Sequence, residues 1–243
     1  MCGRYGVKLK FEDLASLMRT EPVDSMDDTD WGPDLNIAPT DPAPVIIPTP
    51  AGPRLTLHRW GLVPFWANDP RVGARMINAR SDTILDKPAF REPIQKRRLL
   101  VPASGWYEWT HPSPEPGRKK KDLPKPTPHW FTRRDADAPL VFAGLSSSWK
   151  DKATGERRET FCIITTDAND DTRAVHDRMP VILEPDQQAL WLDPTTPLDA
   201  LTAMLAPYRG ELTHHVVSTE VNDVKADGAH LILPVRPTQG SLL

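Results

Sequence analysis

The sequence has 243 residues, a formal net charge of −3 and an apolar fraction of 39%. Proline accounts for 27 residues, about twice the average frequency of roughly 5%, and this content excludes a helical bundle or a coiled coil because proline breaks helices. No apolar run approaches the roughly 18 residues of a membrane helix, and two cysteines are too few for a secreted disulfide framework. We therefore expect a cytoplasmic protein that contacts no membrane.

The charge is distributed unevenly along the chain. Residues 12–34 hold eight acidic groups and one arginine, whereas residues 54–98 hold ten Lys or Arg and four acidic groups. Local fields decide which ligands a surface attracts, so a phosphate-binding face is compatible with the small negative total. An ordinary solvated surface carries the same kind of pattern, and the charge permits nucleic-acid binding without requiring it.

Most of the predicted elements are short strands. A helix is predicted over residues 10–20, where Phe11, Leu14, Leu17 and Met18 recur at helical spacing. Short β-branched segments bounded by proline or glycine predict strands at 44–47, 54–63, 99–102, 106–109, 129–132, 140–145, 160–165, 181–183 and 215–217. Further helices are predicted at 88–96, 185–192 and 197–206, where Pro185 and Pro197 suit a helix start.

Residues 110–128 contain six prolines and five Lys or Arg with almost no apolar side chain. Such a composition cannot bury a core and predicts a flexible basic loop. We interpret it as an insertion between two strands of one sheet, because no pattern of helices and strands restarts after it. The expected fold is a single α+β domain over residues 1–243, dominated by antiparallel strands.

Cys2 is the most informative position. Removal of Met1, which a small second residue favours, would leave Cys2 with a free α-amine and a thiol on adjacent carbons. Such a group condenses with an aldehyde to an imine, which the thiol then closes to a thiazolidine. It can also act as an N-terminal nucleophile towards an amide. A chance cysteine at a frayed terminus is the remaining interpretation.

Three polar residues are candidates for ligand contacts. Arg4, two residues from Cys2, could fork onto a phosphate, or form a surface ion pair. Asn78 and Arg80 in INARSDT are two residues apart, which places both side chains on one face if the segment is a strand. A polar strand edge would show the same spacing.

Two further residues are candidates for proton transfer. Glu108 lies between Tyr107 and Trp109, and desolvation by aromatic neighbours would raise its pKa towards general-acid use. His176 precedes an apolar segment and is a candidate base. An exposed strand carboxylate and a structural histidine are the alternatives.

The segment WGLVPFWA at 60–67 contains two kinds of aromatic position. Trp60 and Leu62 are expected in the core, whereas Phe65 and Trp66 follow a proline and are expected to be exposed. Exposed aromatics in a basic segment suit stacking on bases, worth about 1–3 kcal/mol per base, with core packing as the competitor.

The sequence offers no pattern for a cofactor. Cys162 lies among apolar residues and is interpreted as a buried thiol. There is no CxxC, the histidines lack ligand spacing, and neither GxxxxGK[ST] nor GxGxxG occurs. We expect no metal and no nucleotide cofactor.

Nine segments together resemble one family. They are MCGRY at the start, NIAPT at 36–40, WGLVPFWA, NARSDT at 78–83, ASGWYEW at 103–109, FAGLSSSW at 142–149, FCIITTDAN at 161–169, HDRMPVIL at 176–183 and VSTEVND at 217–223. In this order the chain is similar to the SOS-response-associated peptidase (SRAP) family, whose members process abasic sites in single-stranded DNA. The similarity covers residues 2 to about 235, apart from the basic loop.

The resemblance implies a barrel-like, mostly antiparallel β core with flanking short helices and a groove for single-stranded DNA. It implies that Cys2, freed by Met1 removal, traps the ring-opened abasic sugar as a thiazolidine. It further implies that Asn78 contacts the sugar, Glu108 assists ring opening, His176 transfers protons, Arg4 and Arg80 hold phosphates, and Phe65 and Trp66 lie against bases.

Two other functions stay open. One is a thiol peptidase or amidase that uses Cys2, including removal of the residues ahead of it, and the other is a non-catalytic single-strand binder. For the abasic-site function that the resemblance implies, the expected partner is single-stranded DNA with abasic sites, bound by a monomer in the cytoplasm and at the nucleoid.

Overall fold

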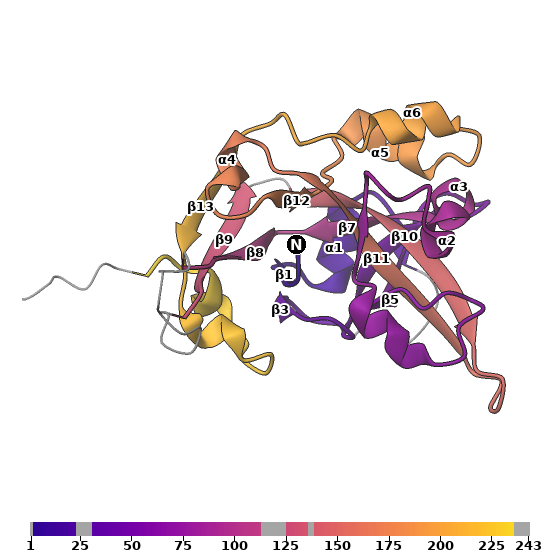
Figure 1. Ribbon diagram of the computed structural model, residues 1–243, viewed down its shortest axis with the longest axis horizontal. Helices are drawn as coiled ribbons and strands as arrows, with labels where there is room; N and C mark the ends of the chain where they lie inside the picture. The colour runs from indigo at the N-terminus through magenta and orange to yellow at the C-terminus, as the bar shows by residue number, and fades with distance from the viewer. Residues whose placement is uncertain (1, 23–30, 113–124, 136–138, 236–243) are drawn as a thin grey trace, which may run out of the picture.

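The computed structural model describes residues 2–22, 31–112, 125–135 and 139–235 of the chain. It shows one α+β domain in which β-sheets carry most of the structure and the helices are short (Figure 1). The expected fold class is confirmed. Residues 113–124, the centre of the predicted basic loop, lie outside the described residues.

Five strands form a closed β-barrel at the centre of the fold. They are β4 (Pro42–Ile47), β5 (Arg54–Trp60), β7 (Arg98–Ala103), β10 (Leu140–Lys150) and β11 (Arg157–Asp167). Neighbours pair antiparallel in the order β11–β10–β7–β4–β5, and a short parallel pairing of β5 with β11 closes the ring. Side chains such as Leu99, Val101, Phe142 and Phe161 fill the core and are fully buried.

A second, five-stranded antiparallel sheet lies against the barrel, to the left in Figure 1. Its strands, in spatial order, are β13 (Leu212–Val216), β9 (Thr127–Arg133), β8 (Gly105–Thr110), β1 (Tyr5–Val7) and β3 (Asp34–Ile37). The ring of Tyr5 meets that of Trp60 edge-on, with 5.1 Å between centroids, and this contact joins the sheet to the barrel core. β8 and β9 pair up to Thr110 and Thr127, at either end of the basic segment.

Two three-residue strands extend the barrel wall at the end of β11. β6 (Asn78–Arg80) pairs in parallel with residues 163–165 of β11, directly after the stretch that pairs with β5. β12 (Arg178–Pro180) pairs with residues 165–167 on the opposite edge, beyond β10. The end of β11 therefore brings the segments that carry Asn78 and His176 to one place.

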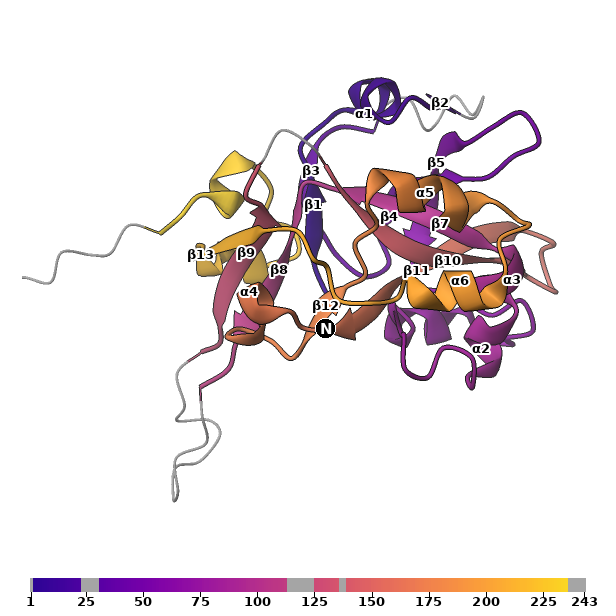
Figure 2. The same cartoon turned by 90° about the horizontal axis from the view of Figure 1, so that it is seen from above.

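The helices cover the outside of the sheets. Figure 2 shows α5 and α6 over the barrel and away from β8, β9 and β13. The remaining elements are α1 (Phe11–Leu17), β2 (Glu21–Pro22), η1 (Pro70–Arg75), α2 (Pro88–Arg91), α3 (Pro93–Lys96), α4 (Asp170–Arg173), α5 (Pro185–Leu192), α6 (Leu198–Ala203), η3 (Thr219–Asn222) and η4 (Ala229–Ile232). Trp191 of α5 is fully buried, and its Nε1 donates to the carbonyl of Leu99.

Most predicted elements are confirmed, with boundaries shifted by a few residues. The helix over 185–192 is found with these bounds, and that over 10–20 shortens to Phe11–Leu17. The single helix over 88–96 is wrong, because Pro93 begins a second helix and lacks the N–H that a continuous helix needs. The strand at 181–183 is also wrong: the paired strand is Arg178–Pro180, and Ile182 makes only an isolated bridge.

Candidate functional site

Cys2 lies in the interior, just before β1. Its residue is fully buried, and the Arg4 carbonyl accepts a hydrogen bond from the Tyr107 N–H, which continues the pairing of β1 with β8 towards Cys2. Asn78 at the start of β6 donates from Nδ2 to the Cys2 carbonyl oxygen over 2.8 Å. Two residues 76 positions apart are thus in direct contact.

The environment of Cys2 keeps its thiol protonated. Burial raises the pKa of the Cys2 thiol well above its ordinary value, and the nearby Glu108 carboxylate raises it further. A hydrogen bond from the Arg4 backbone N–H acts in the opposite direction but does not outweigh burial. A reaction through this sulfur therefore needs a group that accepts its proton.

Glu108 on β8 supplies the carboxyl group that acts on the Cys2 thiol. Only 3% of the residue is exposed, and burial raises the pKa of its side chain from 4.5 to about 7. At neutral pH both protonation states are populated, which suits a group that gives and takes protons.

His176 faces Glu108 from the loop between α4 and β12. Its Nε2 lies 4.0 Å from Glu108 Oε2, and its Nδ1 accepts a hydrogen bond from the Arg178 N–H over 3.0 Å. Burial lowers the pKa of His176, so the ring is mostly neutral at pH 7, with its proton on Nε2 when Nδ1 accepts. The Asp177 carboxylate, 2.9 Å from Nδ1, would support the protonated ring instead.

A hollow of about 410 Å³ opens beside these two groups. It is lined by Glu108, Trp109, His111, Lys125, Pro126, His176 and Asn222. The Trp109 indole N–H donates to Asn222 Oδ1 over 2.8 Å, which ties its wall to η3. The hollow gives a ligand access to the Glu108–His176 pair.

Asn78 has an unused acceptor in the interior. Its Oδ1 is buried, and no hydrogen-bond partner for this atom is found among the described residues. A buried acceptor without a partner is costly, so this atom is suited to a donor supplied by a ligand or an amine.

The sequence predicts that Arg4 lies at the surface, but the structure places it in the interior. Its residue is 9% exposed, and NH1 donates to Asn36 Oδ1 over 2.6 Å and to the Val221 carbonyl over 2.7 Å. Asn36 in turn donates to the carbonyls of Asp223 and Ala226. This geometry makes Arg4 an internal tie to the segment after β13, and its phosphate contact stays a prediction.

Arg80 is exposed at the end of β6. It forms a two-pronged ion pair with Asp82, from Nε to Oδ1 and from NH2 to Oδ2 over 2.7 Å. Asp82 also lies 3.9 Å from the buried Arg178, whose main carboxylate partner is Asp167 at 2.8 Å. A phosphate at Arg80 would have to compete with Asp82.

Phe65 and Trp66 are exposed, as predicted, with 64% and 54% of their surfaces accessible. Trp60 and Leu62 are fully buried, which confirms their place in the core, although the strand ends at Trp60. The backbone near Trp66 is held because the Trp149 indole N–H donates to the Ala67 carbonyl. The two aromatic rings therefore project from a fixed turn.

The described residues hold no evident metal site and no membrane helix. In ranges 2–22, 31–112, 125–135 and 139–235, no group of three or more His, Cys, Asp or Glu is placed to hold a metal ion. Within the same ranges, each helix is too short or too polar to cross a membrane. Cys162 is a fully buried free thiol.

Comparison with known proteins identifies the family. The family model described as SOS response associated peptidase (SRAP) matches residues 1–224. The chain belongs to this family. It is 36% identical to the abasic site processing protein YoaM of Bacillus subtilis, over 96% of this chain and 97% of YoaM. It is 34% identical to YoqW of the same organism, also named an abasic site processing protein, over 96% of this chain and 99% of YoqW.

A solved structure has the same fold as this SRAP chain. A Bacteroides thetaiotaomicron protein superposes with a TM-score of 0.84 and 27% identity, over 97% of this chain and all of that one. Sequence reasoning about this SRAP chain missed Trp109, Lys125 and Asn222 as walls of the hollow. Each of them carried a separate signal: Trp109 lies beside Glu108 on a predicted strand, Lys125 lies in the basic segment at 110–128, and Asn222 lies in VSTEVND.

Proposed function

We propose that this protein recognises abasic sites in single-stranded DNA and traps them covalently through Cys2. The observation that carries the proposal is the convergence of Cys2, Asn78, Glu108 and His176, which come from four separate segments of the chain. The relatives named abasic site processing proteins support the same substrate. All four groups come from one chain, so we propose that a monomer is sufficient.

The proposed reaction joins the sugar to both functional groups of Cys2. The abasic sugar opens to an aldehyde at C1′, and the α-amine freed by Met1 removal attacks this carbon. The aldehyde oxygen leaves as water and an imine remains. Sγ then adds to C1′ as the thiol proton passes through a base to the nitrogen, which closes a five-membered thiazolidine.

Each neighbouring group has a role that fits its environment. Glu108, with a pKa near 7, donates the proton that opens the sugar ring and can accept one afterwards. His176, neutral at pH 7, accepts and returns protons, including during reversal of the crosslink. Asn78 holds the Cys2 carbonyl through Nδ2, and its buried Oδ1 is free to accept from the Cys2 amine or the sugar.

DNA recognition would depend on the backbone and on stacking. We propose that Phe65 and Trp66 lie against bases next to the abasic site and that Arg80 exchanges Asp82 for a phosphate. Contacts of this kind read no base edges, so little sequence preference is expected. A missing base also lowers the cost of unstacking the sugar, which favours damaged sites over intact ones.

Intact-mass measurement after incubation with an abasic oligonucleotide tests the proposal. The mature protein should begin at Cys2 and gain the mass of the oligonucleotide minus one water. Cys2→Ala should form no stable adduct, and Cys2→Ser should form only a labile imine that borohydride can trap. An adduct on protein that retains Met1 would contradict the thiazolidine. Cleavage of added peptides would indicate a thiol peptidase instead, and reversible binding alone would indicate a non-catalytic binder.

A further inference from the structure

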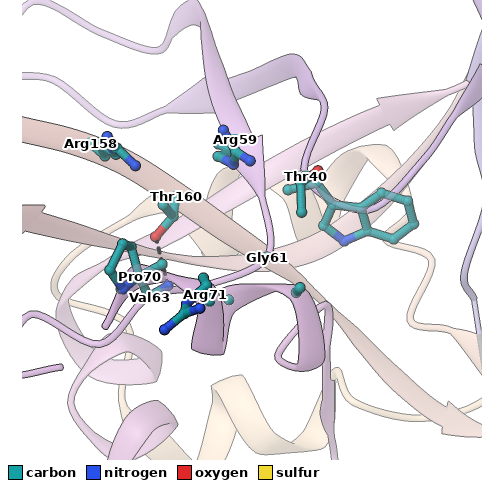
Figure 3. A pocket seen from close by; sticks show the side chains of 11 residues that line it. Thr40, Arg59, Gly61, Val63, Pro70, Arg71, Arg158 and Thr160 are labelled. Carbon is teal, nitrogen blue, oxygen red and sulfur yellow. Dashed lines mark hydrogen bonds between the residues drawn. The ribbon is translucent and has the colours of Figure 1, made fainter. Parts of the chain in front are cut away.

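A second hollow lies on the outside of the barrel, where β5, η1 and β11 meet. It has a volume of about 170 Å³, and three arginines line it: Arg59 on β5, Arg71 on η1 and Arg158 on β11 (Figure 3). It shares no lining residue with the hollow beside Glu108 and His176. None of the roles assigned above uses these arginines.

We propose that this hollow binds a phosphate group of the DNA strand that flanks the abasic site. The inference rests on the proposed function, since it adds a contact for the same substrate. The ligand chemistry is a phosphate oxyanion held by arginine side chains. A free phosphate ion has the same chemistry, and the experiment below separates the two sources.

The charge of the lining favours an anion. No acidic residue lines the hollow, and among the described residues Arg59 makes no ion pair. Arg71 and Arg158 pair with Asp69 and Glu156, each two residues away. Both pairs are exposed to solvent, and exposed pairs contribute little, so Arg71 can turn to a better anion. Arg158 also lies over the Trp149 ring, 5.7 Å from its centroid, which holds this guanidinium at the barrel wall.

The size of the hollow favours a phosphate over a whole nucleotide. Pockets for drug-sized ligands have volumes of about 300–1,000 Å³, well above the 170 Å³ found here. An anion of a few heavy atoms fits such a space, with water around it. The remainder of the strand would lie outside on the surface.

The hollow has a fixed frame. The Thr160 hydroxyl accepts a hydrogen bond from the Val63 N–H over 2.9 Å, drawn as a dashed line in Figure 3. The same hydroxyl donates a hydrogen bond to the Ser147 carbonyl. Gly61, with a φ of +121°, lies so close to Gly73 that a Cβ on Gly61 would be 2.6 Å from the Gly73 oxygen. These contacts hold η1, and with it Arg71, against the barrel.

The position along β11 connects the hollow to the proposed DNA path. Arg59 pairs with Thr160, and Asn78 pairs with Ile163 three residues further along the same edge, so their backbones are about 10 Å apart at roughly 3.3 Å per residue. Because this offset is odd, Arg59 projects from the outer face of the barrel wall and Asn78 from the inner face. The chain between these two points carries Phe65 and Trp66. A strand held at Asn78 would therefore have to pass around this segment, past Phe65 and Trp66, for a flanking phosphate to reach the arginines on the outer face.

A methylphosphonate scan tests the inference. Single-stranded oligonucleotides would carry one tetrahydrofuran abasic analogue, which binds reversibly, and one neutral linkage at each flanking position in turn. For the wild type, neutralising one phosphate several positions from the abasic site should lower affinity. Arg59→Gln should show the same loss on the unmodified strand, lower the salt slope by about 0.7, and show no further loss at that position.

The controls distinguish a DNA phosphate from a free phosphate ion, and a specific contact from a general effect of positive charge. Arg134→Gln changes another exposed arginine, which is paired with Glu211, and should bind every strand as the wild type does. Independent, additive losses from Arg59→Gln and from each neutral linkage would overturn the inference. It would also be overturned if Arg59 affected only the binding of inorganic phosphate.

Adduct formation distinguishes failure of this inference from failure of the proposed function. Arg59→Gln should need a higher concentration of the abasic strand than the wild type to form the covalent adduct, because the substitution weakens binding and leaves the chemical site intact. If the wild type forms no adduct, the proposed function fails, whereas the scan with the unreactive analogue still decides whether the hollow binds DNA phosphate.

Discussion

Glu108 on β8 and His129 on β9 lie directly opposite each other in the sheet register. Paired residues of antiparallel strands project from the same face, so His129 borders the carboxyl group of the site. Nδ1 of His129 lies 3.2 Å from Nδ1 of His214 on β13, and burial lowers the pKa of both histidines. A neutral imidazole pair supplies no cation to the carboxyl group, which is consistent with the raised pKa of Glu108.

Glu108 makes the folding stability depend on pH. Because the pKa of Glu108 is about 7 in the folded protein and 4.5 otherwise, the folded state binds an extra proton between these values. Stability is therefore fully present below about pH 4.5 and falls until about pH 7, by about 3 kcal/mol for a change of this size. Glu108→Gln should reduce this decline, which urea unfolding at pH 5 and pH 8 would measure. An equal decline in both proteins would contradict the assignment.

Crosslinking should lose rate in alkaline solution if Glu108 donates the proton that opens the sugar. The protonated fraction of Glu108 falls as pH rises through its pKa of about 7. We expect the single-turnover rate of adduct formation to fall above pH 7 in the wild type. In Glu108→Gln, the rate should be at least about 10²-fold lower and should lack this dependence. A variant that keeps the falling limb would assign it to another group.

His176 should be separable from Glu108 by the direction of the reaction. His176→Ala should slow transfer of the protein from a purified adduct to excess competing abasic strand, because the returning proton lacks its carrier. Glu108→Gln tested in parallel should mainly slow formation on natural abasic sites. Wild-type rates in both assays would remove the two residues from proton transfer. A loss of binding alone would make them supports of the hollow.

Substitution of Arg4 should mainly lower folding stability, whereas substitution of Arg80 should mainly weaken DNA binding. Arg4→Ala leaves Asn36 Oδ1 and the Val221 carbonyl without their buried partner, so we expect a loss of about 3 kcal/mol in unfolding free energy. Arg80→Ala removes an exposed pair and should change stability by less than about 0.5 kcal/mol. Arg80→Ala should instead reduce the salt slope of single-strand binding by about 0.7. Equal stability losses would contradict the internal role of Arg4.

Trp66 should contribute to DNA affinity without contributing to stability. Trp66→Ala removes an exposed ring, and loss of one stacked base should weaken single-strand binding by about 1–3 kcal/mol. Leu190→Ala is a matched control, since Leu190 of α5 is 50% exposed and lies on another surface. Fluorescence anisotropy with unmodified and abasic strands measures both. Normal affinity of Trp66→Ala for every strand would place the DNA elsewhere.

Local pattern was sufficient for some parts of the site. Glu108 was predicted on a strand beside aromatic residues, and the structure adds a buried neighbourhood that its sequence neighbours alone do not supply. Phe65 and Trp66 were predicted to be exposed because Pro64 ends the strand pattern. For Phe65 and Trp66 the decisive feature is within a few residues along the chain, whereas the burial of Glu108 depends on segments distant in sequence.

Contacts between distant segments were beyond the reach of local pattern. The hydrogen bond between Asn78 and Cys2 requires β6 to pair with β11 and β1 to pair with β8. The spacing of residues within either strand does not predict these pairings. The internal acceptor of Arg4, Asn36, lies 32 residues away along the chain. Sequence spacing does not reveal this contact, so a phosphate is the ligand that the sequence predicts for Arg4.

The strand at the end of β11 was misplaced for a similar reason. Residues 181–183 are apolar and β-branched, which predicted a strand there, whereas the pairing begins at Arg178. Arg178 donates to the Thr165 carbonyl and the Asp167 carboxylate, so a charged residue is satisfied inside the barrel edge. The strand propensities of residues 178–183 do not predict these hydrogen bonds of Arg178, and so they do not predict a strand that begins at a charged residue.

The arrangement of β5 and β6 along one edge of β11 has a consequence for how the family can diversify. β5 and β6 occupy successive positions along the same edge of β11, and residues 61–77 form an excursion between them. The base of this excursion is held by the close approach of Gly61 to Gly73 and by a hydrogen bond from the Leu62 N–H to the Met76 carbonyl. The tip of this excursion can therefore be exchanged without changing the register that positions Asn78. If the excursion contacts DNA as proposed, DNA preference could change by exchanging its tip, while the residues proposed for trapping keep their positions in the barrel wall.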